Sequence, residues 1–144
     1  VGRQLTRGQD MALGIGFYIG GSPQAAVDAV RPYHDERYKW FAPFGFVRYT
    51  DAEGRPWGTP GAPVRVPSID AGVPQKAWFC GTSRQFVDYL RDIEAKYAGL
   101  EDMILQWPEG MPWLEFKDQL SMFARDVMPA FTGQQSATVS GDGD

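Results

Sequence analysis

The sequence contains a single cysteine, Cys80, and a single histidine, His34, among its 144 residues. One cysteine cannot form an intramolecular disulfide or a cysteine-rich zinc site. There is no second histidine for a metal cluster, and the neighbours Asp35 and Glu36 would not share a helix face. The sequence therefore predicts neither a disulfide framework nor a metal site.

Basic clusters and long apolar runs are also missing. The 14 lysines and arginines are outnumbered by 18 acidic residues, for a formal net charge of −4, and they form no block. We therefore expect no nucleic-acid partner and no membrane partner. No apolar run approaches the roughly 18 residues of a membrane span. The start, VGRQLTRGQD, lacks the apolar region of a secretory signal, so we expect a cytoplasmic protein.

Apolar and aromatic residues, in contrast, are plentiful. Hydrophobic residues make up 43% of the chain, aromatic residues 14% and charged residues 22%, which is the composition of a globular protein. The length suits one domain. Because the chain does not begin with methionine, we expect a processed chain or part of a longer one.

Short apolar runs alternate with helical patterns along the chain. The runs 11–19 (MALGIGFYI), 76–80 (KAWFC) and 102–107 (DMILQW) read as strands. Apolar residues at helical spacing follow each of them, and Ser22 and Thr82 stand at predicted N-caps, Thr82 with Gln85 in a capping box. Pro32 should kink or divide the first helix. This alternation predicts an α/β fold with parallel strands, because parallel neighbours need a crossover helix.

Two segments break the alternation. Residues 42–75 carry six prolines and show no sustained period. They predict a long loop with a short helical turn near residues 68–72, and a loop of this length is expected to be functional or packed against something else. Residues 132–144 are small and polar and predict a disordered tail.

Cys80 has two interpretations. The run C-G-T-S, from Cys80 to Ser83, is similar to the monothiol form of a thioredoxin-type motif, and a helix N-terminus lowers the pKa of a nearby thiol. Against this, Cys80 continues the strand pattern, and free cysteine is among the most buried residue types. His34 lies in a polar stretch of a predicted helix, which indicates a solvated helix face.

Glycine-containing turns follow the first two strands. Gly20, Gly81 and Thr82 lie where a strand ends and a helix begins, and backbone N–H groups at such places can bind phosphate. Neither turn is a full G-x-G-x-x-G or P-loop pattern. Ordinary connecting turns are therefore the alternative interpretation.

Other strand ends supply candidates for substrate binding. In parallel α/β folds, ligands meet the carboxyl ends of the strands. Tyr18, Gln106 and Trp107 stand at such ends, and Gln106 or Trp107 could contact a planar ligand by hydrogen bonding or stacking. A tryptophan of the core or of an interface is the alternative for Trp107.

The second half of the chain resembles the bacterial-luciferase-like, flavin-dependent monooxygenase family. Residues 78–83 (WFCGTS) and the helix after them are similar to an apolar strand, G-[TS]-P-E and a helix in that family. Residues 104–112 (ILQWPEGMP) resemble its last strand and loop, and residues 121–131 (SMFARDVMPAF) its closing helix. The resemblance spans residues 3–131, and residues 121–129 are its most specific part. Ser83 and Arg84 depart from the family pattern, which has proline and an acidic residue there.

The resemblance implies a (β/α)8 TIM barrel, which takes about 250 residues. Residues 1–131 would supply its C-terminal portion, about three βα units, with the loop 42–75 over the barrel mouth. Gly20, Gly81 and Thr82 would contact FMN or, alternatively, F420, and Tyr18, Gln106 and Trp107 the organic substrate. The reduced flavin and O2 would oxidise that substrate, and no catalytic residue is assigned.

Partners follow from the same resemblance. A flavin reductase would supply reduced flavin. An open part of a barrel exposes sheet edges and inner strand faces, so the missing N-terminal half or a second copy should cover them. Two other functions stay open: a small thioredoxin-like thiol protein using Cys80 and Ser83, and a non-catalytic α/β interaction module.

Overall fold

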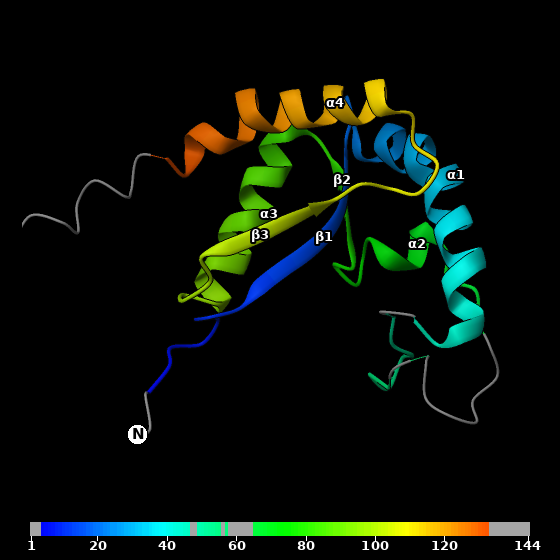
Figure 1. The fold of residues 1–144 in the computed structure, drawn as a ribbon, viewed down its shortest axis with the longest axis horizontal. Helices are drawn as coiled ribbons and strands as arrows, with labels where there is room; N and C mark the ends of the chain where they lie inside the picture. The colour runs from blue at the N-terminus through cyan, green and yellow to red at the C-terminus, as the bar shows by residue number, and fades with distance from the viewer. Residues whose placement is uncertain (1–3, 47–48, 56, 58–64, 133–144) are drawn as a thin grey trace, which may run out of the picture.

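The chain alternates strands and helices, as the sequence patterns predict (Figure 1). A computed structural model describes residues 4–46, 49–55, 57 and 65–132. The strands are β1 (Ala12–Ile19), β2 (Trp78–Gly81) and β3 (Asp102–Gln106); the helices are α1 (Pro23–Phe41), α2 (Ile69–Gly72), α3 (Ser83–Lys96) and α4 (Trp113–Met122). A π-helical turn (Phe123–Val127) and a 3₁₀ turn (Met128–Ala130) continue α4.

The helix starts follow the predicted capping residues. The Ser22 hydroxyl accepts a hydrogen bond from the Ala25 amide at the start of α1. Thr82 and Gln85 form the predicted capping box at the start of α3. Such caps satisfy amides that have no partner within the helix, and each contributes about 1 kcal/mol.

Pro32 does not divide α1, which runs without interruption from Pro23 to Phe41. A stripe of buried residues at a spacing of four continues through the proline: Ala26, Val30, His34 and Tyr38. Packing on both sides of Pro32 therefore holds the helix together despite the lost backbone hydrogen bond.

The strands form one parallel sheet in the order β2-β1-β3. The first half of β1 pairs with β3, with Gly14 beside Ile104, and the second half pairs with β2, with Gly16 beside Trp78. The predicted α/β fold with parallel strands is confirmed. In a stretch of a barrel, consecutive strands would be neighbours, whereas here β3 lies beside β1 and not beside β2.

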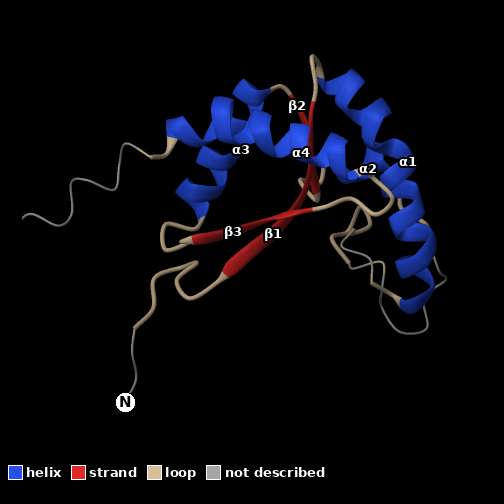
Figure 2. Ribbon diagram, turned by 45° about the horizontal axis from the view of Figure 1, so that its top comes forward, coloured by secondary structure: helices blue, strands red, loops and turns tan. Residues whose placement is uncertain are grey.

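Helices cover both faces of the sheet (Figure 2). On one face, Ile15, Phe17 and Ile19 of β1 pack against α3 and α4, including Phe86 and Phe116. α3 buries its apolar side against β1, so the chain crosses over β1 between β2 and β3. This packing explains the strand order, and it also differs from a barrel, whose helices all lie on the outer face.

The opposite face of β2 packs against α1 and α2. Trp78 and Cys80 share a core cluster with Ala26, Val30 and Ile69. α2 confirms the short helical turn predicted near residues 68–72. Tyr49, from the segment predicted as a loop, is fully buried in the same cluster, so part of residues 42–75 belongs to the core.

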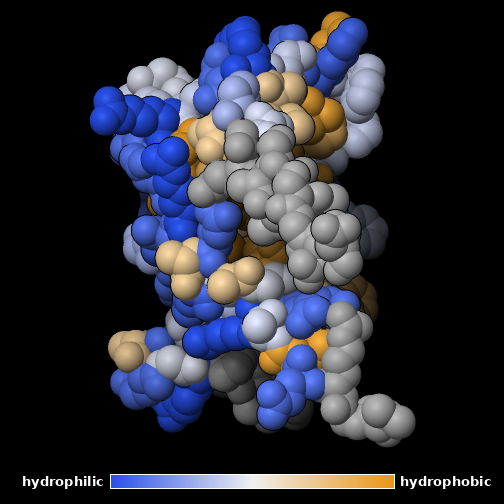
Figure 3. Space-filling model, turned by 90° about the vertical axis from the view of Figure 1, so that its left-hand side faces the viewer, coloured by the Kyte–Doolittle hydropathy of each residue, from blue (hydrophilic) through white to orange (hydrophobic). Residues whose placement is uncertain are grey.

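The prediction for His34 is wrong. Its side chain is fully buried, because it continues the stripe of α1 that faces the sheet. Residues 133–144 of the predicted polar tail lie outside the described residues. Within the described part of the chain, no helix combines the length and the apolar character needed to cross a membrane. On the side of α3, hydrophilic surface alternates with small hydrophobic areas (Figure 3).

Candidate functional site

Helix α4 crosses the carboxyl end of β1 (Figure 1). The Gln119 side chain accepts a hydrogen bond from the Ile19 amide at 2.6 Å and donates one to the Ile19 carbonyl oxygen at 3.1 Å. Gln119 is buried. The strand end where a ligand was expected therefore carries a side chain of the protein itself.

Tyr18 belongs to a second group of contacts with α4. The hydroxyls of Tyr18 and Tyr33 donate to the two carboxylate oxygens of Glu115, at 2.8 and 2.7 Å. Burial and the carboxylate raise the pKa of Tyr18, and the hydrogen bond to Glu115, followed by burial, raises that of Tyr33. Both phenols are thus neutral donors that connect β1, α1 and α4.

The predicted phosphate-binding amides already have partners within the chain. The Gly20 amide donates to the Gly81 carbonyl oxygen at 2.9 Å. The Thr82 amide donates to the Gln85 side chain at 2.9 Å as part of the capping box. The structure brings Gly20, Gly81 and Thr82 together at one end of the sheet, but it uses two of their amides for local structure.

On the face opposite α3 and α4, no helix among the described residues covers the part of the sheet formed by β3 and the first half of β1 (Figure 2). Ile104, in the middle of β3, is 55% exposed on this face. We call the surface formed by Ala12, Gly14, Ile104 and Gln106 the bare face. These residues share one face because side chains alternate along a strand and the register pairs Gly14 with Ile104.

Gln106 lies across the glycine of the bare face. Its Nε2 atom is 2.8 Å from the position that a Cβ atom on Gly14 would take. Gly14 therefore provides the space that the Gln106 amide occupies. Tyr18 lies on the same face of β1 four residues further along, but it packs against the cluster that α1 covers and bonds to Glu115, so it is not part of the bare face.

Trp107, the remaining predicted substrate-binding residue, points away from the bare face. Its ring stacks on Phe116 of α4 with centroids 5.2 Å apart and also contacts Trp113. Its indole N–H donates to the Met111 carbonyl oxygen at 2.9 Å. Trp107 is nearly half exposed, so it forms part of an aromatic surface and not of the closed core.

Cys80 does not have the environment of a redox thiol. It is 6% exposed, and burial raises its pKa to about 12. A nucleophilic cysteine needs an accessible thiolate. The geometry agrees with the interpretation of Cys80 as a small buried residue of the second strand.

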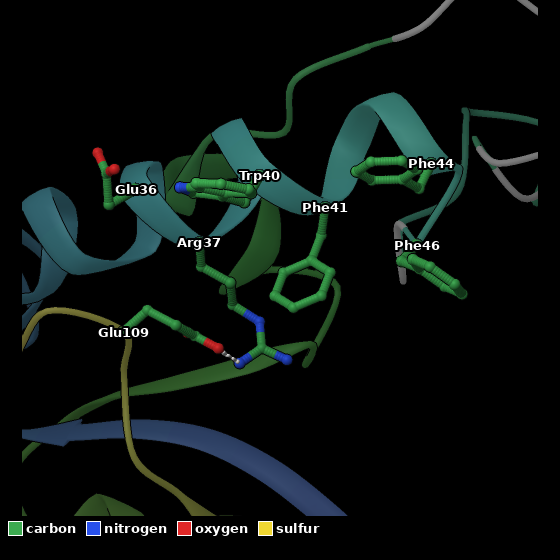
Figure 4. A pocket seen from close by; sticks show the side chains of 7 residues that line it. All are labelled: Glu36, Arg37, Trp40, Phe41, Phe44, Phe46 and Glu109. Carbon is green, nitrogen blue, oxygen red and sulfur yellow. Dashed lines mark hydrogen bonds and ion pairs between the residues drawn. The ribbon is translucent and has the colours of Figure 1, made fainter.

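An aromatic groove at the end of α1 was not foreseen from the sequence. It encloses about 570 Å³ and is lined by Glu36, Arg37, Trp40, Phe41, Phe44, Phe46 and Glu109 (Figure 4). Arg37 donates to both oxygens of Glu109, at 2.8 and 3.0 Å, and joins α1 to the segment after β3. The run WFAPFGF at residues 40–46 was the available signal, because four aromatic residues in seven exceed what one helix end can bury.

The described residues contain no group of three or more His, Cys, Asp or Glu side chains placed to hold a metal ion. Comparisons of the chain with models of protein families, with curated proteins and with solved structures gave no match.

Proposed function

We propose that this chain is part of a luciferase-like, flavin-dependent oxidoreductase and that the bare face contacts the planar ring of the cofactor. FMN is the first candidate and F420 the alternative. In such an enzyme the reduced flavin supplies the chemistry with O2, and the protein positions the flavin and a small organic substrate. A flavin reductase would provide the reduced cofactor.

One observation carries this proposal: Gln106 and Gly14 form a partly exposed surface with an amide group and little side-chain bulk. Cofactor sites are lined mainly by apolar side chains with a few placed hydrogen-bonding groups. Ile104 adds an apolar side chain beside the amide. The apolar side chain and the neighbouring amide support contact of this face with the ring.

A (β/α)8 barrel, as the resemblance implies, belongs to this proposal. β1 and β3 would be barrel strands with α3 and α4 on the outer side, and the bare face would look into the barrel. The strand order β2-β1-β3 and the packing of α1 and α2 on the opposite face of β2 depart from that arrangement. The phosphate of FMN would need donors other than the Gly20 and Thr82 amides, which are bonded within the chain.

Anaerobic titration of the full chain with reduced FMN, and separately with reduced F420, tests the proposal. We expect saturable binding of one of the two, which Gln106→Ala weakens about fivefold, the effect of one lost hydrogen bond of average strength. Gln24→Ala is the matched control, because Gln24 is exposed and bonds to Asp28 within α1. Absence of binding, or equal affinity for all three proteins, would contradict the proposal.

A non-catalytic interaction module is the second candidate. The observation in its favour is the position of Gln119, which occupies the end of β1 where an α/β enzyme would bind its ligand. The aromatic groove gives this candidate a surface for contact. It predicts no binding of flavin or F420 in the titration above.

A further inference from the structure

The two edges of the sheet differ in how they are protected. All four residues of β2, at one edge, are buried. β3, at the other edge, exposes Asp102 and Ile104 and pairs only with β1 among the described residues. An exposed edge strand presents unpaired backbone groups that can pair with another strand.

We propose that β3 pairs with β3 of a second copy of this chain, in antiparallel orientation, around a two-fold axis at Ile104. The result is a continuous six-stranded sheet shared by two chains, each contributing its three strands. A two-fold axis brings the same surface of both copies together, so one strand must be complementary to itself. The inference does not rest on the flavin proposal, because it uses the edge of the sheet, although Ile104 and Gln106 belong to both surfaces.

The sequence of β3 is self-complementary in this register. Ile104 faces its own copy, and Met103 faces Leu105 of the partner subunit. Asp102 faces Gln106 of the partner subunit, so no like charges are opposed. All five residues of β3 take part.

Other registers are less favourable. An axis at Asp102 opposes two carboxylates, which destabilises a cross-strand pair. An axis at Met103 or at Leu105 leaves two of the five residues of β3 outside the pairing. The charge pattern and the length of the strand thus both select Ile104 as the centre.

The exposed side chains favour the same arrangement. Ile104 is 55% exposed in the single chain and would be covered by Ile104 of the partner subunit. Cross-strand apolar pairs contribute roughly 0.2–1 kcal/mol each. A ladder of five residues is a small interface, and small interfaces are weak. We therefore expect a monomer–dimer equilibrium that depends on protein concentration.

Sedimentation velocity over a wide concentration range measures this equilibrium. The wild-type chain should shift from monomer to dimer as its concentration rises. Ile104→Lys opposes two cations at the axis and should remain monomeric. Leu114→Lys is the control, because Leu114 is an exposed apolar residue of α4, outside β3, and this variant should dimerise like the wild type.

Disulfide formation tests the register. Ile104→Cys should form a disulfide-linked dimer under mild oxidation, because the two Cα atoms lie about 5 Å apart in such a pair. Asp102→Cys alone should form no such disulfide. In this register, position 102 of one chain is offset from position 102 of the other by four residues along the strand, about 13 Å. An equal mixture of Asp102→Cys and Gln106→Cys should give the mixed dimer.

Three results would overturn the inference. One is a wild-type chain that stays monomeric at every concentration. Another is dimerisation of Ile104→Lys to the wild-type extent, which would locate the interface elsewhere. The last is equal cross-linking of Asp102→Cys alone and Ile104→Cys, which would show random collision. Cys80 does not confuse the assay, since it is buried.

Discussion

The Nε2 atom of His34 lies 2.7 Å from the hydroxyl oxygen of Tyr49, and both side chains are fully buried. This contact attaches part of the segment after α1 to the middle of that helix. Tyr49→Phe would leave the imidazole nitrogen without its partner. We expect a loss of about 1–3 kcal/mol in the free energy of unfolding, measured by urea denaturation. Tyr97→Phe, on a partly exposed ring, should have a smaller effect.

His34 also makes stability depend on pH. Burial lowers its pKa; Arg31 and Arg37 add to this, and Asp35 opposes it. Below about pH 6.5, the ordinary histidine pKa, the unfolded chain therefore binds a proton that the folded chain does not. Stability should fall as the pH drops through that value toward the folded-state pKa.

An NMR titration of the imidazole resonances measures this pKa directly, because His34 is the sole histidine. A folded-state pKa at or above the ordinary value would contradict the structure. Urea denaturation of His34→Gln should show a smaller loss of stability over the same pH range.

Gln119 should be important for stability because it bonds to both backbone groups of Ile19. Gln119→Met keeps the length of the side chain but leaves a buried amide and a buried carbonyl group unpaired. We expect the free energy of unfolding, measured by urea denaturation, to fall by at least about 2 kcal/mol. Gln24→Met, at an exposed position, should change stability by no more than about 0.5 kcal/mol. Equal effects of the two substitutions would show that α4 does not close the end of β1.

Gly16 and Gly21 form a matched pair for testing the packing of the sheet. A Cβ atom on Gly16 would lie 2.7 Å from the Trp78 ring, whereas one on Gly21 would meet nothing within 4 Å. Gly16→Ala should therefore lower the free energy of unfolding by about 1–3 kcal/mol, and Gly21→Ala should leave it nearly unchanged. Thermal denaturation measures the melting temperatures of the two variants. Similar melting temperatures would show that the Trp78 ring does not lie against Gly16.

The Cys80 thiol should be unreactive in the folded protein. Its burial and its pKa of about 12 leave almost no thiolate at neutral pH. Alkylation by iodoacetamide should become fast only after denaturation in urea. Rapid alkylation of the native protein would restore the thioredoxin-like alternative.

Much of the local structure could be predicted from the sequence. The three strands lie within one or two residues of the predicted runs, and Thr82 and Gln85 form the expected capping box. These features depend on neighbouring residues and on the spacing of apolar side chains. The same kind of pattern identified Tyr18 and Gln106 as residues of strand ends.

Tertiary contacts could not be predicted in the same way. The polar neighbours of His34 suggested exposure, but its place four residues after Val30 determines its burial. The strand order depends on how α3 packs over β1, which no local pattern contains. The contact of Gln119 with Ile19 joins residues 100 positions apart. For this reason the sequence predicted an open end of β1 where the structure has a buried glutamine.

The central claim, that the bare face contacts a flavin, is tested most directly by amide NMR spectra of the full chain during titration with FMN. We predict that the largest shifts occur at the Gln106 side-chain amide and at the backbone amides of Gly14 and Ile104. Spectra without any shift, or with shifts confined to the aromatic groove, would contradict the claim.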